Sequence, residues 1–180
     1  MRPKLALIFA LAAFLVTVPV VGCGEKEGEE AREAVEGEPL HLGGLIYNVA
    51  ITRFLNPADV EDSAYLAGQQ PPPVDQSYLG VFLTISNEED EEIGSATGYA
   101  VTDSTEREYE PLETASAHAL EIGVPVPADD QIPAADTTAS QSAIQGSLLL
   151  FLVADDVSAA RPLELQIEGP EESGHIELDI

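Results

Sequence analysis

The residues of this 180-residue chain that could do chemistry are one cysteine, three histidines and 33 carboxylates. Cys23 has no second cysteine with which to form a disulfide, a redox pair or a thiolate metal cluster. His41, His118 and His175 lie in separate segments without metal-ligand spacing, which is typical of surface or turn histidines. The sequence contains neither a Gly-x-Ser-x-Gly nucleophile turn nor a phosphate-binding glycine loop. We therefore predict no catalytic residue, no cofactor and no enzymatic activity.

Cys23 follows an apolar N-terminal run. Arg2 and Lys4 precede residues 5–21, which are almost entirely apolar. The run is slightly short for a membrane-spanning helix, and Pro19 would remove a helix hydrogen bond near its end. A basic start, an apolar middle and a small residue before the break are typical of a cleaved signal peptide over residues 1–22. An uncleaved membrane anchor and an ordinary secretory signal remain the alternatives.

The four residues Val20-Val21-Gly22-Cys23 resemble the lipobox of bacterial lipoproteins. The resemblance implies cleavage before Cys23 and a diacylglyceryl thioether on its sulfur, with fatty acyl chains such as palmitate as the anchor. Two or more chains anchor a protein stably, whereas one is marginal, because each buried methylene contributes about 0.8 kcal/mol. We therefore expect an extracytoplasmic protein that is held to the cell membrane by its N-terminal lipid.

Charge limits the partners of the mature chain. Residues 1–22 hold two of the seven basic residues and no acid, so five basic residues remain against 33 acidic ones, a formal charge of −28. Nucleic acid is excluded as a partner because it needs a positive footprint. Residues 23–39 are rich in Gly and Glu, which predicts a lipidated, disordered acidic spacer. Residues 40–180 are enough for one domain with a real core.

Most of that domain alternates apolar and polar residues with the period of half-buried strands. The apolar run 147–153 is instead typical of a strand covered on both faces. Turns rich in Gly, Pro and Asp separate these segments, and no convincing helix is present, which predicts an all-β two-sheet sandwich. The expected strands are 45–53, 78–87, 98–103, 107–111, 147–153, 162–168 and 175–180, with a weaker one within 119–126.

Two acid-rich loops are weak candidates for a cation site. Residues 56–77 form a long proline-containing segment that we interpret as a tolerated surface loop, with functional use as the alternative. Carboxylates there and in a later loop could supply oxygens to Ca²⁺, but neither loop has EF-hand spacing. The candidates are Asp59, Glu61 and Asp62, and Asp129 and Asp130. We expect these acids to face water and predict no metal site.

Several strand segments resemble the telokin-like, immunoglobulin-like domain of unknown function found in secreted bacterial lipoproteins. The matching stretches are Tyr78–Asn87, Val101-Thr102-Asp103, Tyr109-Glu110-Pro111, Gly146–Val153 and Pro162–Leu165. The chain departs from that pattern in having Ile132-Pro133-Ala134 where the family has Pro-Gly. The resemblance covers residues 40–180 and implies an immunoglobulin-like antiparallel β-sandwich with long loops. It supplies no catalytic residues.

Two functional classes follow from the sequence. The first is a non-enzymatic binding or structural module at the cell envelope, with an envelope protein or polymer as partner and the membrane contacted through the lipid on Cys23. The second is a Ca²⁺-responsive envelope module that uses its acid-rich loops. Selective stabilisation by Ca²⁺ over Mg²⁺ at matched ionic strength would distinguish the second class from the first.

Overall fold

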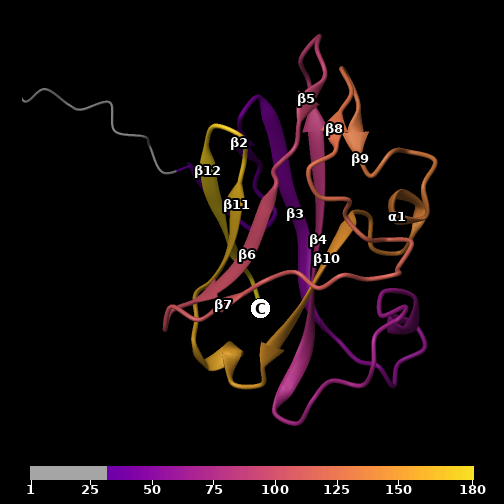
Figure 1. The fold of residues 1–180 in the computed structure, drawn as a ribbon, viewed down its shortest axis with the longest axis vertical. Coiled ribbons are helices and arrows are strands. Elements are labelled where there is room, and N and C mark those ends of the chain that lie inside the picture. Colours follow the sequence, from indigo (N-terminus) through magenta and orange to yellow (C-terminus); the bar gives the residue numbers. More distant parts are fainter. Residues whose placement is uncertain (1–31) are drawn as a thin grey trace, which may run out of the picture.

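The computed structural model describes residues 32–180, which form two packed sheets with a layer of loops against one of them (Figure 1). Sheet A contains, in spatial order, β1 (Arg32–Val35), β12 (Ser173–Leu178), β11 (Leu163–Glu168), β6 (Gly98–Asp103) and β7 (Glu108–Tyr109). Sheet B contains β10 (Ser147–Ala154), β4 (Gln76–Asn87), β3 (Leu45–Leu55) and β2 (Leu40–Leu42), with β9 (Gln131–Ile132) paired to the end of β4. A separate ribbon joins β5 (Ile93–Gly94) to β8 (Pro125–Val126).

Each described strand pair is antiparallel except β1 with β12. The predicted immunoglobulin-like antiparallel sandwich is therefore confirmed for the residues that the structure describes. The expected strands correspond to β3, β4, β6, β7, β10, β11 and β12. The weaker strand within 119–126 is reduced to β8 and one isolated bridge between Ala119 and Leu148.

The main core lies between the two sheets. Inward residues of β3, β4 and β10 face those of β6, β11 and β12, as their period-2 patterns predict. Leu83 and Phe151 are fully buried there, and the hydroxyl of Tyr47 accepts a hydrogen bond from the Ala96 amide. The alternation in the sequence therefore assigned the inward faces of these strands correctly except at Ile51 of β3, where a β-bulge after Val49 shifts the register and leaves the side chain exposed.

A second apolar cluster covers the outer face of sheet B. Tyr78 and Phe82 of β4 and Leu148 and Leu150 of β10 point outward, yet all four are buried. Three loop segments, here called the cover, lie over them: 56–75 with η1 (Asp62–Ala64), 111–120, and 133–146 with α1 (Thr138–Gln141). Figure 1 shows this layer to the right of sheet B.

The interpretation of residues 56–77 as a tolerated surface loop was wrong, because Tyr65 and Leu66 are buried against β4 and β10. The hydroxyl of Tyr78 also donates a 2.6 Å hydrogen bond to the carbonyl of Gln70. The segment is thus a structural layer over an apolar sheet face.

The described sandwich begins earlier than the predicted boundary at residue 40. Residues 32–35, assigned to the disordered spacer from their composition, form β1 and pair in parallel with β12. In the following turn, the Glu36 carboxylate accepts hydrogen bonds from the amides of Thr52 in sheet B, at 3.0 Å, and Asp179 after sheet A, at 3.1 Å. Glu36 therefore joins the edges of the two sheets, and the spacer prediction is corrected from Arg32 onward.

Candidate functional site

The predicted cation candidates do not converge in the structure. Asp62 is buried, and its carboxylate is paired with the Arg53 guanidinium and accepts the Asn56 amide at 2.8 Å. Asp59 instead accepts the Glu61 amide at 2.9 Å, which is a local turn contact. Within residues 32–180, no three His, Asp or Glu side chains are placed to hold a metal ion.

Asp129 and Asp130 belong to the turn between β8 and β9. Asp129 has a positive φ of 54°, and the side chain of Asp130 accepts the amide of Gln131 at 2.8 Å. These contacts shape the turn, and the pair lies on a different segment from Asp59, Glu61 and Asp62. Cys23, the predicted lipidation site, is outside the described residues. No helix within 32–180 is long and apolar enough to cross a membrane.

The histidines do not all behave as expected. His118 lies in a turn, which is one of the two predicted alternatives, but it is not at the surface, since it is only 5% exposed. His41 and His175 are brought together, since both line one groove with Arg32, Glu33 and Glu172. His41 is on β2 of sheet B and His175 on β12 of sheet A, so the packing of the two sheets at this edge creates the proximity, and no spacing in the sequence could have indicated it.

The contact between Ser116 and His118 has the residue types of a nucleophile and its base. The Ser116 hydroxyl, however, donates to the Ala64 carbonyl at 2.8 Å, while His118 Nδ1 lies 3.3 Å from the same oxygen. Because the serine proton is directed to Ala64, the geometry assigns the contact as Nδ1–H donating to the serine oxygen. The pair therefore holds two loop segments together and does not activate the serine.

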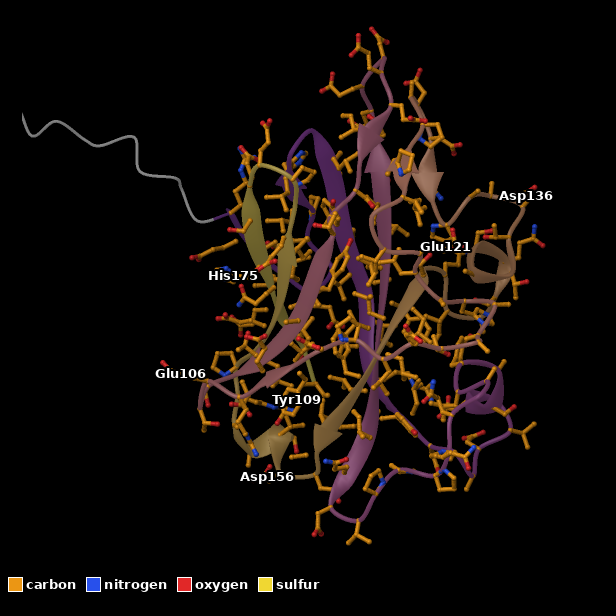
Figure 2. All side chains as sticks on the ribbon, in the orientation of Figure 1. Glu106, Tyr109, Glu121, Asp136, Asp156 and His175 are labelled. Atoms are coloured by element: carbon orange, nitrogen blue, oxygen red, sulfur yellow. The ribbon has the colours of Figure 1, made fainter. Side chains whose placement is uncertain are left out.

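A buried carboxylate organises the turn that ends β6. Burial alone would raise the pKa of Asp103, but hydrogen bonds from Thr105 and Arg107 outweigh it and hold that pKa well below its usual range. Arg107 also reaches Asp156, before η2 (Val157–Ala159), at 2.9 Å. Figure 2 shows Glu106 and Asp156 at this same end of the sandwich. The turn links the end of sheet A to the chain leaving sheet B.

The outer face of sheet A is polar, and no segment of the described residues 32–180 forms a layer over it. One cross-strand row contains Val35, Glu177, Glu164, Thr102 and Glu108 in register. The neighbouring row contains Glu33, His175, Gln166 and Ala100. Figure 2 shows His175 on the side of sheet A away from the core. We call this surface the open face.

Two grooves run along the open face and meet at Gln166 and Ser173, which line both. The first includes Arg32, His41 and His175, and the second includes Thr102, Glu108 and Glu110. Thr102 Oγ1 is buried and has no hydrogen-bond partner among the described residues. The open face thus offers a hollowed, mainly acidic surface with at least one unused polar group.

Like charges stand directly opposite each other on this face. Glu164 of β11 pairs in register with Glu177 of β12, an arrangement that destabilises a sheet. The alternation of these strands was predicted, but the pairing of Glu164 with Glu177 was not, because the sequence of one strand does not determine its register with a distant strand. The open face is the candidate functional site that sequence reasoning missed.

Fold and surface together define an immunoglobulin-like β-sandwich with one covered and one open outer face. No family model and no curated protein matches the chain. Among solved structures, MPT63, a secreted protein from Mycobacterium tuberculosis, aligns with a TM-score of 0.50 and 10% identity over 85% of this chain and 100% of that one. YcdA, a candidate lipoprotein from Bacillus subtilis, aligns with a TM-score of 0.50 and 13% identity over 80% of this chain and 38% of that one.

These likenesses show the fold alone. They agree with the β-sandwich implied by the resemblance to the telokin-like domain, while that family itself is not matched by a model.

Proposed function

We propose that the chain is a lipid-anchored extracytoplasmic lipoprotein whose sandwich is a non-enzymatic binding module, with the open face as its contact surface. The observation that carries this proposal is the asymmetry of the sandwich. The cover buries the outer face of sheet B, while no segment within residues 32–180 covers the outer face of sheet A, which is hollowed by two adjoining grooves. An uncovered sheet face is a normal solvated surface, but joined grooves are a feature of a contact surface.

The charge on the open face indicates the class of partner. Glu33, Glu164, Glu177, Glu108 and Glu168 lie on its strands, against Arg32 and His175 at one side. Arg32 is already paired with Glu172 at 2.8 Å. An excess of carboxylates complements a cationic partner, so we assign a Lys- or Arg-rich protein segment to this face.

Binding of poly-L-lysine to the full chain in detergent tests the surface by calorimetry at 0.15 M NaCl. The open-face variant carries Glu164→Gln and Glu177→Gln together. The control variant carries Glu88→Gln and Glu89→Gln together, in the exposed turn after β4. Each double variant removes two negative charges. We expect the open-face double to weaken binding at least fivefold more than the control. Equal weakening would mean that net charge, and not the open face, determines binding.

The anchor is tested separately at Cys23. We expect an alkyne fatty acid to label the wild-type protein in cells, and Cys23→Ala to abolish labelling and to block normal cleavage. Equal labelling of both forms would remove the basis for the proposed location without affecting the binding surface.

A further inference from the structure

His118 lies at the point where two segments of the cover meet sheet B. Its ring packs edge-on against Tyr65, with centroids 4.7 Å apart, and Tyr65 packs edge-on against Phe82 of β4 at 4.9 Å. The three rings form a continuous contact from the sheet through segment 56–75 to segment 111–120. His118 is thus part of the packing that holds the cover in place.

The main chain around His118 also fixes segment 111–120 to the edge of β10. The amide of Leu148 donates to the carbonyl of His118 at 2.6 Å, and the amide of Leu120 donates to the carbonyl of Leu148 at 2.9 Å. Next to it, Ser116 joins the same segment to Ala64. The contacts of residues 116–120 therefore gather around the imidazole, while the start of the segment is held separately by the Leu112 amide, which donates to the Leu150 carbonyl at 2.7 Å.

Among residues 32–180, no charged side chain compensates a proton on His118. Tyr65 is an uncharged phenol, and Asp62 on the same turn is occupied by Arg53 and the Asn56 amide. On the histidine's own segment, Glu113 is exposed, as is Glu121 just beyond it. β4 and β10 contribute the apolar residues Phe82 and Leu148. Burial lowers the pKa of His118, because it disfavours the charged imidazolium.

We infer that His118 is a proton-sensitive latch, whose protonation releases segment 111–120 from η1 and from the edge of β10. Release would expose the apolar residues beneath that segment, namely Tyr65 of segment 56–75 and the outward residues Phe82 and Leu150 of sheet B, while the core between the sheets remains closed. The inference concerns the covered face and does not depend on the binding function proposed for the open face.

The direction of the pH effect follows from the lowered pKa. The neutral imidazole is the form that fits the folded cover, so its stabilising contribution is complete above the ordinary histidine pKa of about 6.5. It decreases as the pH falls below that value. The latch therefore holds at neutral pH and opens under mildly acidic conditions.

Hydrogen exchange of the full chain in detergent, followed by mass spectrometry at pH 7.5 and pH 5.0, tests the latch. With rates corrected for intrinsic exchange, we expect protection of residues 111–120 to fall at least tenfold at pH 5.0, while β11 and β12 keep theirs. His118→Phe retains an aromatic ring against Tyr65 but cannot titrate, so its cover should stay protected at both pH values. His175→Phe on the open face is the control that keeps the wild-type response.

A second variant and a direct titration of the ring keep the test decisive if His118→Phe does not fold. His118→Gln is neutral and can still donate to Ser116 Oγ, and near-ultraviolet circular dichroism at pH 7.5 checks that both variants are folded. In the wild type, the nuclear magnetic resonance titration of the His118 ring should coincide with the loss of protection in 111–120. Acid-induced opening that persists in His118→Phe and His118→Gln, or a cover that stays protected in the wild type at pH 5.0, would overturn the latch.

Discussion

The two outer faces of this sandwich have opposite surroundings. On sheet B the large outward residues Tyr78 and Phe82 of β4 and Leu148 and Leu150 of β10 are aromatic or aliphatic and are buried beneath three loop segments. On sheet A the outward residues of β6, β11 and β12 are mostly polar or charged and face solvent. A sheet needs a third layer only where its outward positions are apolar, since exposed apolar patches of that size are unfavourable in water.

The comparison also separates two roles for polar groups. Under the cover, Asp62 and His118 are buried and satisfy local contacts between loop segments. On the open face, Glu164 and Glu177 oppose each other across β11 and β12 with no basic residue between them. Polar groups in the cover therefore hold structure together, whereas those on the open face reduce stability and remain available to a partner.

The largest expected effect comes from placing a charge in the core between the two sheets. Phe151→Asp should prevent folding, because an unpaired buried charge costs several kcal/mol and Phe151 is fully buried. Phe54→Asp makes the same change on β3 at a side chain that is 38% exposed, so it should leave the chain folded. Far-ultraviolet circular dichroism and thermal melting distinguish the two outcomes. A native spectrum and unchanged melting temperature for Phe151→Asp would show that the inward faces are assigned wrongly.

The second prediction compares the two outer faces directly. Phe82→Ala, beneath the cover, should lower the free energy of unfolding by about 3–5 kcal/mol, because it removes a large buried side chain and leaves a cavity. Gln166→Ala, on the open face, should change it by less than about 0.5 kcal/mol. Urea denaturation of both variants measures the difference. Similar losses at the two positions would mean that the open face is packed against something in solution.

The asymmetry itself could be predicted in part from the sequence. Residues 163–168 alternate strictly, which indicates one solvated face, while the uninterrupted apolar run 147–153 indicates two covered faces. Phe82 was the signal for a third layer in β4, since it is a large aromatic residue among small and polar outward neighbours. These patterns are local, so a single strand carries them.

The identity of the cover and the details of the site could not be predicted in this way. Segment 111–120 has no regular period, because its residues are buried by irregular contacts such as that between Ser116 and Ala64. β1 was missed because Arg32–Val35 is rich in charge and pairs with a strand about 140 residues away, so its short segment carries no strand period of its own. The opposition of Glu164 and Glu177 depends on register between strands, which no local pattern contains.

The third prediction concerns Asp103, at the turn that connects the ends of the two sheets. Asp103→Asn removes a carboxylate that accepts from Thr105 and Arg107, so we expect a loss of about 1.5–3 kcal/mol, the range for hydrogen bonds to charged groups. The pKa of Asp103 is lowered in the folded state, so its contribution is complete above the unfolded value of about 3.9 and is lost as the pH falls below it.

Melting temperatures of wild type and Asp103→Asn between pH 7 and pH 2.5 check both parts of that prediction. The difference between the two proteins should shrink as the pH falls below about 3.9, because the wild-type carboxylate is then protonated in the unfolded state before it is protonated in the folded state. Asp155→Asn, a neighbour of Asp156 that does not contact Arg107, serves as the control. A difference that is constant across this range would assign the effect of the substitution to packing and not to the charge.

The smallest expected effect is a gain of stability on the open face. Glu164→Gln removes one of two carboxylates that face each other, so it should raise the free energy of unfolding by about 0.2–1 kcal/mol. The amide oxygen of a glutamine can still accept the hydrogen bond that Gln166 now donates at 3.1 Å, so no contact needs to be lost. Urea denaturation at 0.01 M NaCl, where the Debye length is about 30 Å, gives the clearest signal.

Glu168→Gln is the matched control, because it lies on the same strand and carries the same charge but stands opposite Ser173. If the opposed pair is responsible, Glu164→Gln should stabilise more than Glu168→Gln at 0.01 M NaCl, and the difference should narrow at 0.15 M, where screening extends over only about 8 Å. Equal gains would instead reflect the overall negative charge of the chain. A local gain in stability together with weaker poly-L-lysine binding by the variant would show that the carboxylates of β11 and β12 oppose folding and favour the partner at the same positions.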